Sequence, residues 1–291
     1  ELAEMGLLAE SGAVAFTDGN KSIANAKVLS QAMSYASTFD LLLISHCEEP
    51  DLAGSGVMNA GETATRLGLS GIPAMAEVIM IERDIRLAEM RMSRLHIAHV
   101  STAESCAVIA RAKARGMTVT CDTAPPYFAL NETAVGDYRT FSKLSPPLRS
   151  EEDRLAIIEA IKDGTIDAIA SDHTPQDAES KRVPFAQAAF GGVGLDTLFA
   201  LTLELYHNQN LDMLSAIAMI TNKPAQLLGL RAGTLEAGRA ADLTVFDPER
   251  GWKIDSDKLV SKSQNTPFDG RPVQGTIART VVDGRTVFEA P

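Results

Sequence analysis

Two histidines and an aspartate stand at the ends of apolar stretches that are far apart along the chain. His46 follows the stretch 41–45, His99 lies near the end of a second stretch, and Asp172 follows a third. Neutral imidazoles and a carboxylate are the side chains that zinc-type sites use, and a carboxylate at such a site can also take a proton from water. Taken singly, each residue has a structural interpretation, as a core histidine or a solvated carboxylate. If the fold brings them together, they predict a metal-dependent hydrolytic site.

The second stretch contains another histidine, His96, three residues before His99. Side chains of a strand point alternately to its two faces, so these two rings are expected on opposite faces of the sheet. Only one of them can then face the site. We take His99, at the strand end, as the candidate ligand and interpret His96 as structural.

Short apolar runs alternate with segments of helical periodicity. The expected strands are 13–17, 41–45, 95–100, 118–121 and 166–170, and the expected helices include 74–90, 103–115 and 151–162. Strands that are apolar on both faces and alternate with helices indicate a parallel sheet covered by helices. For the helix at 103–115, Ser101 is the expected N-cap, with Glu104 reaching back.

Both a doubly wound sheet and a (β/α)8 TIM-type barrel satisfy this pattern. An ionisable side chain ends every run, and Asp18 and Asp122 complete the set. The carboxyl ends of barrel strands meet at one mouth, whereas a doubly wound sheet has little use for such groups on every strand. The α/β barrel is therefore the expected fold class.

After about residue 232 the sequence pattern changes to short expected strands separated by turns. Short strands are expected at 241–247, 276–282 and 286–289, the last two joined by a turn at Asp283-Gly284. We therefore expect residues 1–232 to form the barrel part and residues 233–291 a small β-sandwich module.

Composition narrows the partners. A net charge of −11 argues against binding to a phosphate backbone. The apolar runs are far shorter than the roughly 20 residues that cross a bilayer, so no membrane partner is expected. Three scattered cysteines without a C-x-x-C pair indicate a reduced, cytoplasmic location. We also expect a small-molecule substrate and a homo-oligomer.

Eight motifs together resemble the bacterial class I dihydroorotases of the amidohydrolase superfamily. In order they are AFTDG (15–19), HCEE (46–49), HIAHVSTAES (96–105), VTCDTAP (119–125), KLSPPLR (143–149), IASDHTP (169–175), FGGVGLDT (190–197) and GTLEAGRAADLTVFD (233–247). The resemblance implies the interconversion of carbamoyl-aspartate and dihydroorotate in pyrimidine biosynthesis, with one or two zinc ions.

The resemblance also assigns roles to individual residues. It implies that His46, His99 and Asp172 bind metal, that Asp172 is also the general base, and that Asp18 is a further ligand if its loop shifts by one residue. The implied substrate-binding residues follow from the same motifs and are Ser145, Gln176, Gly191 and Gly192.

The sequence departs from the family pattern at several points. The family's HxH on the first barrel strand has no counterpart, so the first three strands are expected to lie upstream of residue 1. The bridging aspartate of TDDG aligns with Gly19, and the family's PHH is Pro125-Pro126-Tyr127. Ser145 replaces an asparagine and Gln176 a histidine. Proline and glutamine cannot accept a proton as an imidazole does.

These departures leave two other hypotheses beside a working dihydroorotase. One is a non-catalytic dihydroorotase-like subunit that scaffolds an aspartate carbamoyltransferase and holds no metal. The other is a hydrolase of the hydantoinase or allantoinase type with a remodelled pocket.

Overall fold

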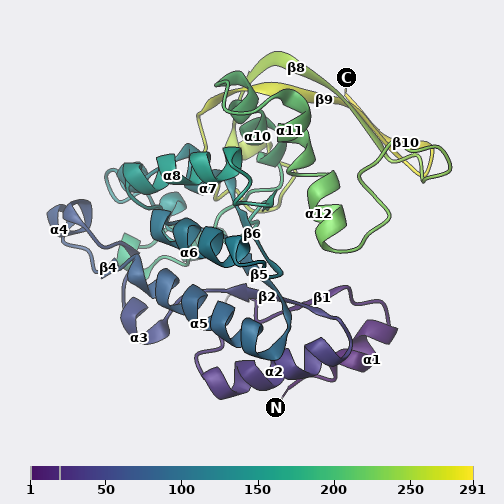
Figure 1. The fold of residues 1–291 in the computed structure, drawn as a ribbon. Coiled ribbons are helices and arrows are strands. Elements are labelled where there is room, and N and C mark those ends of the chain that lie inside the picture. The colour runs from purple at the N-terminus through teal and green to yellow at the C-terminus, as the bar shows by residue number, and fades with distance from the viewer. Residues whose placement is uncertain (1, 20, 291) are drawn as a thin grey trace.

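A parallel sheet of five strands forms the centre of the computed structural model, which describes residues 2–19 and 21–290 (Figure 1). The strand order is β1-β2-β5-β6-β7. The strands are β1 Ala15–Thr17, β2 Leu42–His46, β5 Arg94–Ala98, β6 Val119–Thr123 and β7 Ala168–Ile169. Each of these lies within one residue or two of an expected strand, so the prediction of a parallel sheet is confirmed.

Helices cover the outer side of this sheet. Helices α2 (Ala26–Thr38), α5 (Met75–Arg91), α6 (Ala103–Ala114) and α8 (Glu151–Lys162) pack one against the next (Figure 1). Large apolar side chains between helices and strands are fully buried, and they include Met33, Ile81, Ile97, Ile109 and Ile157. This burial holds the strand ends in fixed positions. The three helices predicted at 74–90, 103–115 and 151–162 are confirmed.

Capping residues define where two of these helices begin. The Ser150 hydroxyl accepts from the Asp153 amide at the start of α8. At the start of α6 the N-cap is Thr102, whose hydroxyl accepts from the Ser105 amide. The prediction of Ser101 as this cap was wrong, because α6 begins at Ala103 and the residue directly before it is Thr102.

Short elements form the rest of this part of the chain. They are α1 Met5–Glu10, α3 Pro50–Ala53, β3 Met58–Asn59, α4 Glu62–Leu67, β4 Gly71–Ile72, α7 Pro125–Ala129, α9 Ala178–Lys181, α10 Leu198–His207, α11 Met213–Ala218 and α12 Asn222–Leu227. Most of them connect the carboxyl ends of sheet strands to the following helices.

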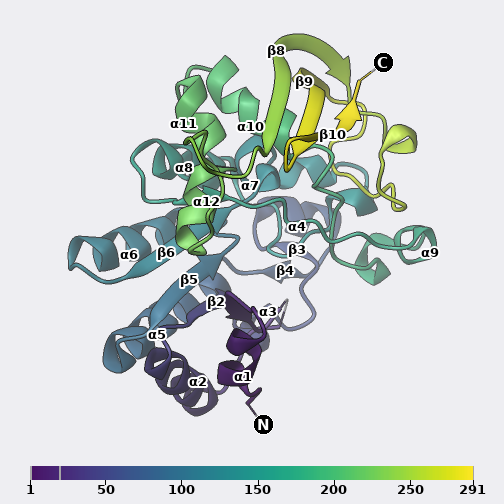
Figure 2. The same ribbon diagram turned by 90° about the vertical axis from the view of Figure 1, so that its right-hand side faces the viewer.

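Three antiparallel strands form a second sheet toward the C-terminus. They are β8 (Leu243–Lys253), β9 (Pro272–Val282) and β10 (Arg285–Glu289), and Figure 2 shows them beside α10. The expected strands and the hairpin turn at Asp283-Gly284 are confirmed. The described residues form one antiparallel sheet here, whereas the sequence led us to expect a sandwich.

Side chains tie this second sheet to α10. The rings of Phe199 and Phe246 meet edge to face with centroids 4.9 Å apart. Arg271 binds both carboxylate oxygens of Glu204, at 2.9 and 2.7 Å. These contacts hold the second sheet against α10.

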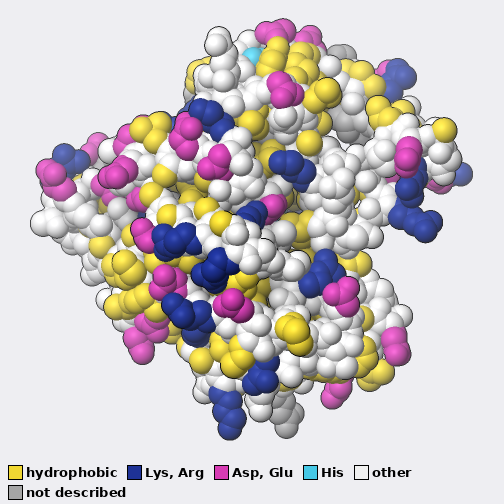
Figure 3. Space-filling view, in the orientation of Figure 1, with side chains coloured by type: hydrophobic (Ala, Val, Ile, Leu, Met, Phe, Trp, Pro, Cys, Tyr) yellow, Lys and Arg dark blue, Asp and Glu magenta, His cyan; other side chains and the backbone are white. Residues whose placement is uncertain are grey.

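The outer surface carries charges of both signs. Acidic and basic side chains lie side by side over the face shown in Figure 3. Exposed ion pairs on α5 and α6 include Arg111–Glu104 and Arg115–Glu89. None of the helices among the described residues is both long and apolar enough to span a bilayer.

Candidate active site

The structure brings His46, His99 and Asp172 to one edge of the central sheet. His46 is the last residue of β2. His99 directly follows β5, and Asp172 lies shortly after the end of β7. The ring centroids of His46 and His99 are 6.2 Å apart, and His99 Nε2 lies 3.7 Å from Asp172 Oδ1. Parallel strands end at the same edge of a sheet, which is why residues so far apart in sequence meet here.

Asp122, in β6, binds both histidines of the β5 segment. Its Oδ1 accepts from the His99 amide at 2.7 Å and lies 3.1 Å from His99 Nδ1. Its Oδ2 lies 2.9 Å from His96 Nε2. The expectation that the two rings point to opposite faces was therefore wrong. His99 lies beyond the strand with a φ of +58°, so the alternation of the strand no longer applies to it.

The electrostatics of these groups follow from their neighbours. Burial and the nearby charge of His99 lower the pKa of His46 to about 4, so its ring is neutral at pH 7. Burial also lowers the pKa of His99, but the carboxylates of Asp122 and Asp172 outweigh this effect and raise that pKa to about 9. Although burial opposes it, His99 and His96 hold the pKa of Asp122 well below its usual range.

Asp18 lies against the main chain at His46. Its two oxygens accept from the amides of His46, at 3.3 Å, and Ile23, at 3.2 Å. Burial raises the pKa of this carboxyl to about 6. Asp18 is thus near the candidate ligand His46, and its hydrogen bonds go to main-chain amides. Gly19, which aligns with the family's bridging aspartate, has a φ of +72° in a turn that suits glycine.

Asp172 and Ser145 complete the inner part of the site. Burial raises the pKa of Asp172, and its Oδ2 is 2.9 Å from the Tyr127 hydroxyl. Ser145 Oγ lies 3.3 Å from His46 Nε2. The predicted ligand His46 and the predicted substrate-binding serine are therefore direct neighbours.

The glycine-rich loop 190–194 packs on the segment that follows β7. A Cβ on Gly194 would lie 2.0 Å from the Ser171 carbonyl oxygen, and one on Gly191 would lie 2.6 Å from that of Thr174. Real Cβ atoms do not approach so closely, so glycine is required at both positions for packing alone. The space between Asp172 and this loop is about 10 Å³, which is room for roughly one water.

Gln176 also bonds within the protein. Its side-chain Nε2 donates to the Phe190 carbonyl at 2.8 Å, and its amide donates to Asn265 Oδ1 at 3.2 Å. Asn265 Nδ2 in turn donates to the Gly191 carbonyl at 3.0 Å. The buried Asn265, from the segment between β8 and β9, therefore fixes the loop that holds Gly191 and Gly192.

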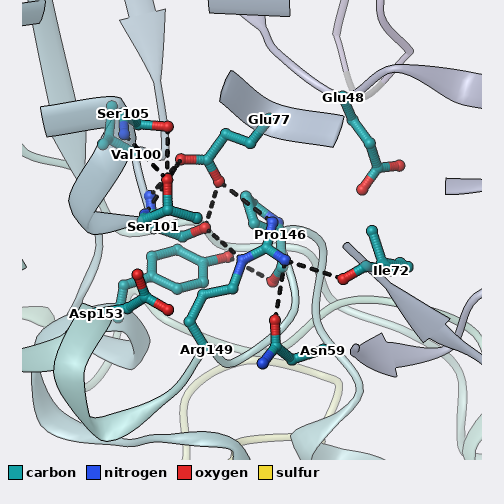
Figure 4. Close-up of polar contacts among 12 residues, drawn as sticks. Glu48, Asn59, Ile72, Glu77, Val100, Ser101, Ser105, Pro146, Arg149 and Asp153 are labelled. Atoms are coloured by element: carbon teal, nitrogen blue, oxygen red, sulfur yellow. Dashed lines mark hydrogen bonds and ion pairs between the residues drawn. The ribbon is translucent and has the colours of Figure 1, made fainter. Parts of the chain in front are cut away.

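Behind the site, a buried ion pair joins the first turn of α5 to the segment before α8. Arg149 Nη2 lies 3.4 Å from Glu77 Oε2, and both side chains are 3% exposed. The guanidinium also donates to Ser101 Oγ at 3.0 Å, and to Asn59 Oδ1 and the Ile72 carbonyl at 3.2 Å each (Figure 4). Figure 4 shows these groups converging on Arg149.

Three of these residues were missed or left without a role by the sequence prediction. Asp122 carried a signal, since it ends an apolar run, but its two partners depend on the backbone turn at His99. Tyr127 carried only the signal of replacing a histidine in the family pattern. Asn265 had no local signal, because its contacts lie more than 70 residues away along the chain.

The donor types at this edge suit a metal ion. Two imidazoles and a carboxylate are a usual set for a catalytic zinc. In the arrangement described, however, His99 and Asp172 are engaged with Asp122 and Tyr127. Within residues 2–19 and 21–290, no three histidine, cysteine, aspartate or glutamate side chains stand close enough together to hold an ion. The chemical types of His46, His99 and Asp172 therefore suit a metal ion, but the three side chains would have to move closer together to bind one.

Comparisons with known proteins agree with this fold. The sequence matches the amidohydrolase family over residues 4–287. It is 48% identical over 288 residues to the dihydroorotase of Geotalea daltonii, covering 99% of this chain and 68% of that protein. It is 44% identical over 291 residues to the dihydroorotase of Anaplasma phagocytophilum, covering all of this chain and 65% of that protein.

Among solved structures, the L-hydantoinase (dihydropyrimidinase) of Arthrobacter aurescens superposes with a TM-score of 0.88 at 26% identity, covering 98% of this chain and 67% of that one. This likeness, with the helix-covered parallel sheet, confirms the predicted TIM-type class. The chain spans about two thirds of the length of the relatives it matches. Family members generally use a metal ion. The chain belongs to the amidohydrolase family.

Proposed function

We propose that this chain is part of a dihydroorotase, which interconverts carbamoyl-aspartate and dihydroorotate in pyrimidine biosynthesis. The observation that carries the proposal is identity of 44–48% to proteins named dihydroorotase along nearly the whole chain. The meeting of His46, His99 and Asp172 at one sheet edge supports it, because a carboxylate close to an imidazole can move a proton during hydrolysis of a cyclic amide.

We assign the roles as follows. His46, His99 and Asp172 would hold a zinc ion, with Asp18 as a further ligand. When bound, such an ion supplies a Lewis acid for the ring carbonyl. Asp172 takes the proton from the attacking water and returns it to the leaving nitrogen. Contacts to the substrate would come from four residues around this centre, namely Ser145, Gln176, Gly191 and Gly192.

Replacing Asp172 by asparagine in the full-length protein tests this assignment. Asp172 has a φ of +46°, which asparagine tolerates, so the fold should be kept. Loss of the proton carrier should lower the rate of dihydroorotate formation by at least about 100-fold. Asp40→Asn is the matched control, because the exposed Asp40 has a φ of +51° and lies outside the site. Equal rates in the two variants would refute the role of Asp172.

A second candidate is a non-catalytic subunit that scaffolds an aspartate carbamoyltransferase. It is favoured by the engagement of His99 and Asp172 with protein partners and by the small space beside Asp172. It predicts full-length protein that binds no zinc, has no turnover and co-purifies with a carbamoyltransferase. Zinc content near one ion per chain, together with turnover that Asp172→Asn abolishes, would rule it out.

We further propose a cytoplasmic protein that forms homo-oligomers. All three cysteines, Cys47, Cys106 and Cys121, are buried as free thiols, which suits a reducing compartment. Light scattering of the full-length protein would give its oligomeric state, and the mass of a monomer would contradict that part of the proposal.

A further inference from the structure

The hydroxyl of Tyr127 lies between two groups of the site. Tyr127 belongs to α7 and is 2% exposed. Its hydroxyl oxygen is 2.9 Å from Asp172 Oδ2 and 3.1 Å from the Pro146 carbonyl oxygen. A phenol has one proton to donate, so a carboxylate and a carbonyl share a single donor.

The contact with Asp172 leaves its two oxygens with different partners. Oδ2 faces the Tyr127 hydroxyl, and Oδ1 faces His99 Nε2 at 3.7 Å. A buried carboxylate without a donor on Oδ2 could rotate about its χ2 torsion, which is broad for aspartate. The phenol therefore sets the orientation in which the carboxylate of Asp172 presents its other oxygen to the imidazole.

The contact with Pro146 joins Asp172 to the segment on the other side of the site. Ser145, the preceding residue, lies against His46, and Arg149 fixes the end of the same segment through Glu77 and Ser101 (Figure 4). Through one hydroxyl, Tyr127 thus connects the carboxylate of Asp172 with the segment that carries Ser145.

We propose that Tyr127 is a positioning residue in this chain, which holds Asp172 Oδ2 and the Pro146 carbonyl so that Asp172 Oδ1 faces His99. The proposal rests on the proposed dihydroorotase function. It assigns to the tyrosine hydroxyl a role at a position where the family motif has a histidine, and it concerns only the orientation of the carboxylate.

Removing the hydroxyl alone is the test, in full-length protein assayed for dihydroorotate formation. We expect Tyr127→Phe to lower kcat by about 10-fold to 100-fold and to leave KM within about twofold, as for other groups that orient a reactive side chain. Tyr138→Phe is the matched control, because the exposed Tyr138 donates its hydroxyl to the Leu67 carbonyl and not to Asp172. It should leave both constants unchanged.

A double variant separates positioning from general weakening of the fold. If Tyr127 acts through Asp172, Tyr127→Phe should cause no further loss in an Asp172→Asn background. Additive losses, or equal effects of Tyr127→Phe and Tyr138→Phe, would overturn the proposal while leaving the dihydroorotase assignment intact.

Absence of turnover in the unmodified protein would instead refute the proposed function. Zinc affinity, measured by competition with a chromophoric chelator, would then decide the role of Tyr127. Binding about 10-fold weaker in Tyr127→Phe than in the unmodified protein supports the positioning role. Equal affinities, or no zinc bound by either protein, would overturn it.

Discussion

Arg149 and Lys181 are both buried cations beside the candidate site, but different partners meet their charges. Arg149 pairs with the carboxylate of Glu77 and shares its remaining donors among neutral oxygens. Within the described part of the chain, Lys181 donates to main-chain carbonyls alone, those of Thr140, Lys143 and Ala189, at 2.6 to 3.3 Å.

Like Lys181, Lys143 places its ammonium group against main-chain carbonyls. Its ammonium donates to the carbonyls of Phe185 and Ala186, and it lies 4.6 Å from the centroid of the Phe190 ring. The guanidinium of Arg149 thus forms an ion pair between separate elements. The ammonium groups of Lys143 and Lys181 instead donate hydrogen bonds to loop carbonyls. Loss of Arg149 should therefore cost more than loss of Lys181, because only the first leaves an unpaired buried charge.

Arg149→Met should have the largest effect on stability. It leaves the Glu77 carboxylate buried without its cation, which costs about 3–5 kcal/mol of the free energy of unfolding. Urea denaturation of the full-length protein measures this value. The conservative Arg149→Lys should recover only part of it, because an ammonium cannot reproduce the planar set of guanidinium donors. A loss below about 1 kcal/mol would contradict the importance of this pair.

Lys181→Met should be less destabilising, by about 1–3 kcal/mol. Three neutral carbonyls lose a donor, but no charge is left unpaired, and methionine fills much of the same space. The same denaturation experiment ranks the two variants. A larger loss for Lys181→Met than for Arg149→Met would reverse the comparison.

The two arrangements should also differ in their response to alkaline pH. Burial, with a smaller effect of the nearby Lys143 charge, lowers the pKa of Lys181 to about 8 from an ordinary 10.5. Between these values the unfolded chain binds more protons at this residue than the folded chain does. Stability of the unmodified protein should therefore gain from this group as pH rises from about 8 to 10. The stability gap to Lys181→Met should widen over that range, and a constant gap would contradict the burial of a titrating ammonium.

The smallest expected effect on stability comes from a surface ion pair, that of Glu151 with Arg154. Arg154 and Asn131 lower the pKa of Glu151 to about 2 from an ordinary 4.5. The contribution of the ionised Glu151 carboxylate to the free energy of unfolding is present above pH 4.5 and is lost as pH falls toward 2. Because the carboxylate is largely exposed, Glu151→Gln should cost only about 0.5 kcal/mol at pH 7. A loss comparable to that of Arg149→Met would mean that burial does not govern these pairs.

Much of the fold could be predicted because its core strands are short apolar runs. Runs such as 41–45 and 95–100 carry their own signal, and their polar ends indicated a barrel mouth. The cap of α6 was assigned one residue too early, because Ser101 and Thr102 have equally suitable hydroxyls. Both hydroxyls donate to the distant Glu77, and only that of Thr102 also accepts from the Ser105 amide.

The site was less predictable than the fold. The meeting of His46, His99 and Asp172 followed from strand ends, but the pairing of His96 and His99 through Asp122 depends on one positive φ. The contacts of Asn265 depend on how a distant segment folds back. Motif spacing contains no information on either, because both arise from tertiary packing.

The most direct test of the dihydroorotase assignment is the ratio of kcat/KM for dihydroorotate and for hydantoin, measured on one preparation of the full-length protein. The curated relatives named above are dihydroorotases, whereas the solved structure described is a hydantoinase. We predict ring opening of dihydroorotate with a kcat/KM about 100-fold or more above that for hydantoin, which lacks the carboxylate. Preference for hydantoin, or no turnover of either compound, would contradict the assignment.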